Sequence, residues 1–486
     1  MKTTTDRIKE LFTTYSKDAI TSIDKLPQAG SERHYFRIHT ADKNYIATYG
    51  ANIQENDVFI YFSEHFQKQD LATAHILAVN EEKDIYLQED FGDISLLNKL
   101  EEHGYVQSVY ELYKESLHQL ALLHVKGHEG LDYTKCLTNS SFGKEAIMAD
   151  LLYFKYYFLD ALRRPYDKQK LIKDFEALSN YLAHTEYKFF MFRDFQSRNI
   201  MVEQDNSVHF IDYQGGMKGA PQYDVASLLS QAKANLPEEW KYHLLEDYIN
   251  AFEKIVSETV DRDVFRSQYN GYVLIRLLQV LGAYGFRGLF ERKAHFLTSI
   301  PLALQNLKTF ISHQSIGIAV TEFKKVLEIC ISDEVMEEFT PVQATPETPL
   351  VVTINSFSFI KTGYPKDETE NGGGFVFDMR GILNPGRFDE YKHLSGLDKP
   401  VKDFLEQQTK MPDFLNSVYS IVDISVEDYI KRGFENLVIS FGCTGGQHRS
   451  VYAAEALARH LRNKFKVKIV LNHNNKDNWK TQQANP

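Results

Sequence analysis

The sequence predicts a protein of two folded parts: an N-terminal α+β part with a small β-rich lobe and a larger helical lobe, and a C-terminal α/β part. Three observations predict this. The 486 residues are too many for one ordinary hydrophobic core. Residues 331–350 are acidic and rich in proline, which is typical of an extended linker. Helical periodicity dominates before this segment, and strand-like runs with a strand–loop–helix unit follow it.

Composition and charge narrow the class of protein. With 43% hydrophobic and 25% charged residues the chain has the composition of a soluble globular protein. The formal net charge of −11 argues against a general nucleic-acid binder, which normally has a basic surface. Cys136, Cys330 and Cys443 lie far apart and form no CxxC pair. Their spacing favours a reduced, cytoplasmic compartment over a disulfide scaffold or a zinc ribbon.

The apolar segments of the chain predict no membrane attachment. No run reaches about 18 consecutive apolar residues, so we expect no transmembrane span and no membrane partner. The first residues, MKTTTDRIKELFTTY, are expected to form an amphipathic helix rather than a signal peptide. We therefore expect a cytoplasmic location.

The N-terminal part is predicted over residues 1–330, with the small lobe at about 1–90 and the large lobe at about 91–330. In the small lobe, the strand-like segments HYFRIHT, NYIATYG and DIYLQED surround one helical stretch. From residue 105 onward, apolar residues recur at helical spacing. One break interrupts the helices, where IMVE and VHFIDY have the pattern of a β-hairpin joined by QDNS.

The C-terminal part is predicted over residues 351–486, after the linker at 331–350. Four of its segments have the pattern of strands: VVTINSFSF, GGFVFDMR, NLVISFG and KVKIVLNH. A long helix, SVYAAEALARHLRNKF, lies between the last two, which predicts an α/β arrangement.

Asp194, Asn199 and Asp212 form the first group of candidate site residues. Asp194 and Asn199 lie five positions apart in FRDFQSRNIM, and Asp212 follows at the end of the next hairpin strand. Phosphoryl transfer needs a carboxylate to orient the attacking hydroxyl and oxygen ligands to hold Mg²⁺ against the nucleotide phosphates. An isolated Asp–Asn pair more often caps turns, but the hairpin context favours a catalytic loop.

Residues 20–315, approximately, resemble the aminoglycoside-phosphotransferase family, kinase-like enzymes that phosphorylate small-molecule hydroxyls. Within that family they resemble the kinases that act on the anomeric hydroxyl of N-acetylmuramate or N-acetylglucosamine. The resemblance implies a protein-kinase-like fold with ATP and Mg²⁺ as cofactors. The motifs that carry it are GSERHYFRI, YLQEDFGDISL, FRDFQSRNIM, HFIDYQGGMKGAPQYDVASLL and PLALQNLKTFI.

The same resemblance implies roles for single residues. Asp194 would be the catalytic base, Asn199 and Asp212 would hold Mg²⁺, and Asp224 would brace the catalytic loop. The other implied residues would bind the nucleotide, either by closing over its phosphates or as a hinge beside the adenine. The phosphate group is Gly30, Ser31, Arg33 and Arg37, and the hinge group is Gln88, Glu89 and Asp90.

Two positions depart from the family pattern. Phe192 stands where the family has a bracing histidine. Thr48 or a neighbour stands where many kinases have a lysine that contacts phosphate. We expect Arg33 or Arg37 to supply the positive charge in its place.

Five further side chains leave alternatives open. Glu55 and Glu64 are equal candidates for the glutamate that orients the phosphate site. His124 and His128 have metal-ligand spacing on a predicted helix, but packing or surface roles are more common for such a pair. Asp150 begins an aromatic-rich helical run, where it could face the sugar or remain a surface acid.

The second group of candidates lies in FGCTGGQHRSVYAAE, residues 441–455, which follows a predicted strand and opens a helix. Gly445 and Gly446 allow a tight turn and a close approach of the backbone to a ligand. The helix N-terminus offers N–H groups and Arg449 adds a guanidinium, which predicts an anion site, most simply for phosphate. Cys443 and Arg449 also have the C-x5-R spacing of protein tyrosine phosphatases, which leaves a nucleophilic cysteine as an alternative.

Residues 351–475 resemble the C-terminal domain of the RapZ family of RNase adapter proteins, which senses glucosamine-6-phosphate. The motifs SFSFIKTGYP, FVFDMRGILNPGR, LSGLDKPVKDFL and GCTGGQHRSVYAAEALA carry the resemblance in order. It implies a phosphosugar pocket and favours binding over phosphatase chemistry. The pocket would be lined by Asp378, Arg380, Thr444, Gly445, His448, Arg449 and Ser450.

Three features depart from that family. Gly386 follows ILNP, where the family often has a histidine. The final residues, LNHNNKDNWKTQQANP, hold only two lysines, which argues against RNA as a partner. No GxxxxGK[ST] motif occurs, so the P-loop domain that precedes this module in the family is not expected.

Together these features predict an ATP-dependent kinase that phosphorylates an amino sugar, N-acetylmuramate or N-acetylglucosamine in cell-wall recycling, with a C-terminal phosphosugar-sensing domain. Two alternatives stay open. The kinase could act on another hydroxyl compound, such as an aminoglycoside, choline or homoserine. The chain could also be a sensor or adapter whose kinase domain has little activity.

Overall fold

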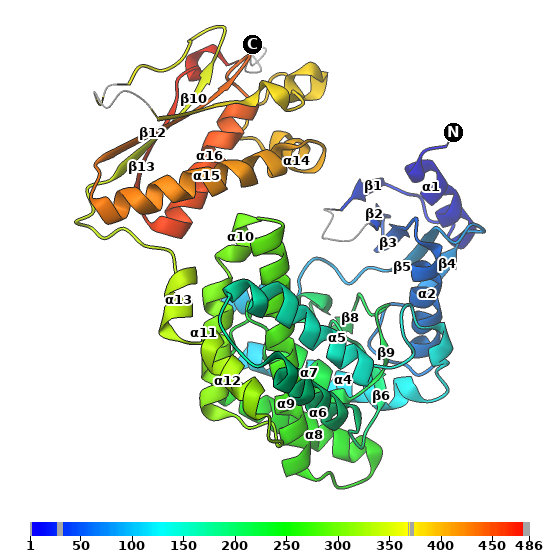
Figure 1. Cartoon of the computed structure of the whole chain (residues 1–486). Helices are drawn as coiled ribbons and strands as arrows, with labels where there is room; N and C mark the ends of the chain where they lie inside the picture. The colour runs from blue at the N-terminus through cyan, green and yellow to red at the C-terminus, as the bar shows by residue number, and fades with distance from the viewer. Residues whose placement is uncertain (1, 27–32, 368, 370–373, 480–486) are drawn as a thin grey trace. The chain divides into compact units, whose positions relative to one another are not determined.

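The computed structural model describes residues 2–26, 33–367, 369 and 374–479, which form two compact units (Figure 1). The segments 157–162 and 282–304, predicted within the N-terminal part, belong to unit 2. The chain therefore crosses from unit 1 to unit 2 and back twice before residue 330. Unit 1 holds Met1–Tyr156, Arg163–Leu281 and Gln305–Ile329, and unit 2 holds Tyr157–Leu162, Gly282–Leu304 and Cys330–Pro486.

A five-stranded antiparallel sheet forms the small lobe of unit 1, with the strand order β1-β2-β3-β5-β4. Helix α1 begins where Thr3 and Asp6 cap each other, and its buried Ile8 and Phe12 share a core with Ile38 of the sheet. The elements are α1 (Thr4–Tyr15), β1 (Ser22–Lys25), β2 (His34–His39), β3 (Asn44–Tyr49), α2 (Ile53–Gln67), β4 (Ile76–Val79) and β5 (Ile85–Glu89).

The large lobe of unit 1 is helical and contains two short β-ribbons. β6 (Phe189–Met191) pairs with β9 (Met217–Gly219), and β7 (Ile200–Val202) pairs with β8 (Val208–Phe210). Helices α9 and α11 extend beyond this unit. The helices are α3 (Leu96–His103), α4 (Gln107–His128), α5 (Lys144–Phe154), α6 (Lys168–Ala183), α7 (Pro221–Leu229), α8 (Glu238–Val256), α9 (Arg262–Tyr284), α11 (Ile300–His313) and α12 (Thr321–Cys330).

Unit 2 is built on a four-stranded parallel sheet with the order β11-β12-β10-β13. The central strands β10 and β12 are the most deeply buried, and α16 packs against both. Parallel strands of this kind need helical crossovers, which α14, α15 and α16 supply. The elements are β10 (Val351–Ser358), β11 (Gly374–Asp378), α14 (Lys399–Gln407), α15 (Met411–Arg432), β12 (Asn436–Cys443), α16 (Arg449–Phe465) and β13 (Lys468–His473).

The predicted fold class is confirmed: an antiparallel sheet followed by helices precedes a parallel α/β part. The prediction of an extended linker at 331–350 was wrong for its first half, which forms α13 (Asp333–Phe339). Ser332 caps this helix by accepting a hydrogen bond from the N–H of Val335, and Val335 is fully buried. The helix is stabilised by its cap, by acidic residues in its first turn and by one buried contact. Together these features outweigh the linker-like composition of the segment.

Among the described residues, one helix, Arg262–Phe290, is long and apolar enough to cross a membrane by length and composition. Half of its most apolar 18-residue window is buried within the protein. Core helices of globular proteins meet the same criterion. Arg276 on this helix makes hydrogen bonds inside unit 1, as a core helix would.

Candidate functional site

The loop between β6 and β7 brings the first group of predicted residues together. The side-chain amide of Asn199 donates to the backbone oxygen of Asp194 at 3.0 Å and lies 3.5 Å from the carboxylate of Asp212. Arg193 and Asp212 adopt positive φ angles of 77° and 71°, which side chains other than glycine rarely adopt. Such backbone strain persists where surrounding contacts enforce it, and it is common at active sites.

Asp224 of α7 enforces this loop conformation. Its fully buried carboxylate accepts hydrogen bonds from the N–H groups of Phe192 at 2.6 Å and Arg193 at 2.9 Å. His124 of α4 lies 3.0 Å from the same carboxylate, and its other ring nitrogen lies 2.7 Å from the Tyr248 hydroxyl. These contacts place Asp224 where a bracing role requires it, and they leave no ring nitrogen of His124 for a metal.

Phe192, which stands where the related family has histidine, fills an apolar cluster instead. Its ring contacts Phe195, Phe210 and Tyr213 at centroid distances of 5.3, 6.2 and 6.0 Å. The loop is therefore held on one side by packing and on the other by His124 and Asp224. His124 is a site-supporting residue whose role the sequence did not reveal, because a single histidine on an aliphatic helix gives no specific signal.

Arg33, which the sequence offered in place of the missing lysine, lies beside Asp212. Its guanidinium lies 3.0 Å from Asp212 and 3.4 Å from Glu55 of α2, and only 4% of the side chain is exposed. Burial opposes its charge, but Tyr35, Tyr86 and the two carboxylates outweigh burial and raise the pKa of Arg33. Of the two glutamates that the sequence left open, Glu55 pairs with Arg33, whereas Glu64 is exposed.

Arg37 does not serve the same purpose. It forms ion pairs with Asp90 at 2.6 Å and with Asp93 at 2.8 Å, which fastens β2 to the hinge. Of the two arginines that the sequence offered, only Arg33 reaches Asp212. Gly30 and Ser31 lie outside the described residues, so the loop expected over the phosphates has no structural account.

A cavity of about 1120 Å³ lies between the lobes of unit 1 and is lined by Arg33, Glu55, Asn199 and Asp212, among others. All three predicted hinge residues line it. Glu89 and Asp90 bond to the protein, whereas the buried side-chain oxygen of Gln88 has no hydrogen-bond partner among the described residues. A buried acceptor without a partner fits a nucleotide base that carries an amino group. The oxygen donors of Asn199 and Asp212 are of the kind that Mg²⁺ prefers.

A polar network lies on the other side of Asp194. Arg276 of α9 donates to the hydroxyl of Tyr223 at 3.0 Å and to the side-chain oxygen of Gln279 at 2.8 Å, and Gln279 contacts Asp150. Burial opposes the charge of Arg276, but Tyr223, Asp194 and Asp150 raise its pKa. Burial also raises the pKa of Asp150. Asp150 therefore belongs to a network beside the candidate base and is not a surface acid.

In unit 2 the loop between β12 and α16 is held from outside by three side chains. Ser358 donates to the carbonyl of Thr444 at 2.6 Å, and Asn475 donates to that of Gly445 at 2.7 Å. Trp479 donates to the carbonyl of Gly446 at 2.8 Å, and Gly446 has a φ of +60° that favours glycine. The loop lies at the carboxyl ends of β10 and β12, where parallel α/β sheets bind ligands.

Arg449 opens α16 but is largely occupied by the protein. One of its nitrogens donates to the backbone oxygens of Arg380 at 3.2 Å and Ile382 at 2.7 Å, while its buried Nε has no hydrogen-bond partner among the described residues. Burial lowers the pKa of Arg449. Arg380 pairs with Asp378 at 2.6 Å and lowers the pKa of that carboxyl.

The remaining predicted pocket residues lie along the same loop. Thr444 and Gly445 are exposed, whereas His448 and Ser450 are buried. A ring nitrogen of His448 lies 2.9 Å from the backbone oxygen of Tyr391, and burial lowers its pKa. A Cβ on Gly386 would come within 3.0 Å of the His448 ring, so glycine there leaves room for this histidine.

The sulfur of Cys443 is buried and partnered. It accepts a hydrogen bond from the N–H of Gly446 at 3.1 Å and lies 3.2 Å from the hydroxyl of Ser450. Only 2% of Cys443 is exposed. A nucleophile must be accessible to its substrate, so this burial supports the binding interpretation over the phosphatase alternative.

Family models match both parts of the chain. The phosphotransferase enzyme family matches residues 31–262, and the RapZ C-terminal domain matches residues 350–477. Solved structures similar to the chain include an ethanolamine kinase from Plasmodium vivax, 13% identical, with a TM-score of 0.42 over 60% of this chain and 82% of that one. The choline kinase LicA from Streptococcus pneumoniae is 13% identical, with a TM-score of 0.39 over 64% of this chain and all of that one.

Curated relatives carry the name nucleotide-binding protein. One from Fervidobacterium nodosum is 31% identical over 283 residues, which cover 52% of this chain and 94% of the relative. One from Clostridium acetobutylicum is 38% identical over 117 residues, which cover 24% of this chain and 38% of the relative. The chain therefore joins a domain of the phosphotransferase enzyme family to a RapZ C-terminal domain, and it belongs to the same family as the Fervidobacterium nodosum protein.

Proposed function

We propose that unit 1 is an ATP-dependent kinase that phosphorylates a hydroxyl of an amino sugar, N-acetylmuramate or N-acetylglucosamine, in cell-wall recycling in the cytoplasm. One observation carries the proposal. Asn199 links the backbone of Asp194 to the carboxylate of Asp212, beside the Arg33–Glu55 pair. This brings a general base, two oxygen ligands and a fixed positive charge close together.

Each of these residues has a task in phosphoryl transfer. Asp194 accepts the proton of the acceptor hydroxyl and orients that hydroxyl toward the nucleotide. Asn199 and Asp212 would hold Mg²⁺, which neutralises charge on the phosphates when bound. Arg33 keeps a positive charge beside Asp212, and Glu55 fixes the position of its guanidinium. Gln88 offers a free acceptor to the nucleotide base.

The network around Arg276 supports an acceptor with several polar groups. Among the described residues no carboxylate forms an ion pair with Arg276, which donates hydrogen bonds to the neutral side chains of Tyr223 and Gln279. A guanidinium of this kind suits a carboxylate or hydroxyl oxygens of an acceptor, and Asp150 suits hydroxyl or amide donors. The guanidinium suits N-acetylmuramate, which has a carboxylate, better than choline, which is a cation.

An ATP-consumption screen with the full chain tests the proposal, with Asp194→Asn as the matched control. The panel holds N-acetylmuramate, N-acetylglucosamine, an aminoglycoside, choline and homoserine. We expect turnover with an amino sugar that Asp194→Asn abolishes. Turnover only with another member of the panel would establish that substrate class instead. If no acceptor is consumed, the chain is a sensor or adapter.

For unit 2 we propose binding of a phosphosugar such as glucosamine-6-phosphate. The observation that favours it is the loop at 444–446, whose three carbonyls are all held by side chains outside the loop. This leaves the N–H groups of Thr444 and Gly445 as the groups that an anion can meet. Calorimetry with the full chain and glucosamine-6-phosphate tests it, and absence of binding would contradict it.

A further inference from the structure

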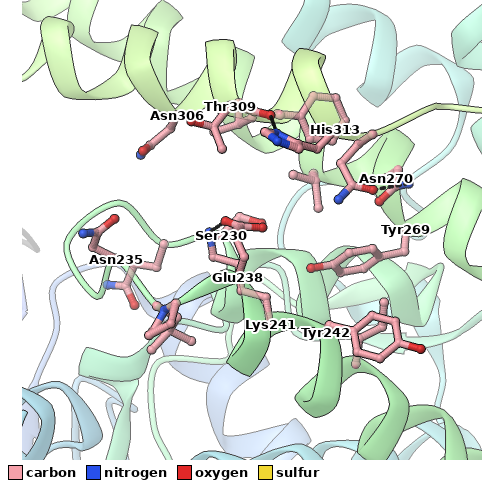
Figure 2. A pocket seen from close by; sticks show the side chains of 18 of the residues that line it. Ser230, Asn235, Glu238, Lys241, Tyr242, Tyr269, Asn270, Asn306, Thr309 and His313 are labelled. Atoms are coloured by element: carbon pink, nitrogen blue, oxygen red, sulfur yellow. Dashed lines mark hydrogen bonds and ion pairs between the residues drawn. The ribbon is translucent and has the colours of Figure 1, made fainter. Parts of the chain in front are cut away.

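A second cavity, of about 610 Å³, lies in the large lobe of unit 1 and shares no lining residue with the cleft between the lobes. Helices α8, α9 and α11 and the segment 230–237 surround it. Figure 2 shows Asn306 and Thr309 of α11 on one side and Ser230 and Asn235 on the other. The hydroxyl of Tyr269 points into the space between them (Figure 2).

The lining of the cavity combines buried apolar side chains with polar ones. Leu245, Val273, Leu277 and Phe310 line it and are buried. The polar lining consists mostly of amide and hydroxyl side chains, which can donate and accept hydrogen bonds at the same time. A ring with an apolar face and polar edges is the ligand that such a surface fits. The amide and hydroxyl groups belong to Ser230, Gln231, Asn235, Tyr269, Asn270, Asn306, Thr309 and Gln314.

The charged side chains of the lining are already paired. Lys241 lies 2.6 Å from Glu238, and Arg266 lies 2.8 Å from Glu246. His313 lies 2.8 Å from the backbone oxygen of Thr309. The paired carboxylates offset these positive charges and so weaken the attraction for an anionic ligand, whereas an uncharged ligand does not depend on them. The lining therefore favours a neutral compound.

One lining residue also contacts the catalytic loop. The side-chain oxygen of Gln231 accepts hydrogen bonds from the N–H of Ser197 at 3.1 Å and from its hydroxyl at 2.6 Å. Ser197 is buried and lies between Asp194 and Asn199. A ligand that displaces Gln231 would therefore change the position of the loop that carries the candidate base and a candidate Mg²⁺ ligand.

We propose that this cavity is an effector site for an uncharged saccharide of one or two rings, and that its occupancy alters the catalytic loop through the Gln231–Ser197 contact. The binding step is independent of the proposed kinase function, and only an effect on turnover rests on it. Binding and loop protection can therefore be measured without ATP, so that failure of either proposal is distinguishable from failure of the other.

Calorimetry with N,N′-diacetylchitobiose and maltose tests the binding step, with adenosine and glucosamine-6-phosphate as comparators. Asn306→Trp places an indole in the cavity, and Gln305→Trp, on the exposed side of the same helix, is its matched control. We expect a neutral saccharide to bind. Asn306→Trp should lower the affinity for this saccharide at least about tenfold, and Gln305→Trp should leave the affinity unchanged. Arg276→Met, which alters the proposed acceptor site, should leave this binding in place.

Melting temperatures check that each variant is folded, and Thr309→Val, which removes one hydroxyl at constant shape, should weaken the same saccharide. Hydrogen exchange of residues 194–199 then tests the coupling. Addition of the saccharide should change their exchange in the parent but not in Gln231→Leu. The proposal is overturned if no neutral saccharide binds, if Asn306→Trp binds it as the parent does, or if the exchange response survives in Gln231→Leu.

Discussion

The guanidinium of Arg33 lies 3.0 Å from the carboxylate of Asp212, although the two residues are 179 positions apart in the chain. Many kinases have a lysine that contacts phosphate, and this chain has Thr48 or a neighbour at the corresponding strand. The structure resolves that departure by bringing an arginine from the start of β2. The proposed kinase activity should therefore depend on Arg33.

Arg33→Met should reduce kcat with ATP by about a hundredfold or more, because a preorganised charge beside the phosphates is lost. The matched control is Arg37→Met, since Arg37 lies in β2, four residues after Arg33, but pairs with Asp90 and Asp93. Arg37→Met should lower thermal stability and should affect the KM for ATP more than kcat. Steady-state kinetics check both variants. Equal losses of kcat in Arg33→Met and Arg37→Met would show that Arg33 contributes no more to turnover than Arg37 does.

Asp194→Ala and Asp194→Asn should lower turnover by about three orders of magnitude while the melting temperature stays close to that of the parent, because general-base catalysis is lost and the fold is not. Single-turnover rates and thermal melts measure the two effects. Near-normal turnover in a folded Asp194→Ala protein would show that Asp194 is not the general base.

Asp224→Asn should destabilise unit 1 by about 1–3 kcal/mol, because one buried N–H of the catalytic loop loses a charged acceptor. Asp263, whose side chain is 96% exposed, provides the control. Asp263→Asn should change stability by less than about 0.5 kcal/mol. Denaturant unfolding compares the two variants, and similar midpoints would contradict the bracing role.

Arg276→Met should raise the KM for an acidic acceptor at least about tenfold and leave the KM for ATP unchanged, because the proposed contact between its guanidinium and the acceptor is lost. The KM for N-acetylmuramate should rise more than the KM for N-acetylglucosamine, which has no carboxylate. Initial-rate measurements with both sugars check this. If the KM changed equally for the two sugars, the role of Arg276 would be purely structural.

Arg449→Ala should weaken the binding of glucosamine-6-phosphate by about 1.5–3 kcal/mol, since a charged donor in a desolvated position is removed. Part of that loss will come from the turn at Arg380–Ile382, which Arg449 also holds. Cys443→Ser should leave binding nearly intact. Calorimetry of the full chain measures binding, and a phosphate-release assay is the control. Phosphate release that depends on Cys443 would favour the phosphatase alternative instead.

The sequence determined the fold class and the main elements because their signals are local. Strands such as β2 and β12 and helix α16 carry apolar residues at the spacing of their own secondary structure. The same holds for Asp194, Asn199 and Asp212, whose order along one hairpin is visible without any tertiary information. Helix α15 has no counterpart among the predicted elements, because its many β-branched residues lower helix propensity and packing in unit 2 decides its state.

The tertiary structure decided which distant side chains meet. It selected Glu55 over Glu64 and Arg33 over Arg37, and it brought His124 to Asp224 across 100 positions of sequence. Pairings of this kind depend on how helices and strands pack, and a single sequence carries no local pattern that encodes them. The Gln231–Ser197 contact and the cavity beside it belong to the same class, because a cavity is a property of the packed lobe and not of any segment.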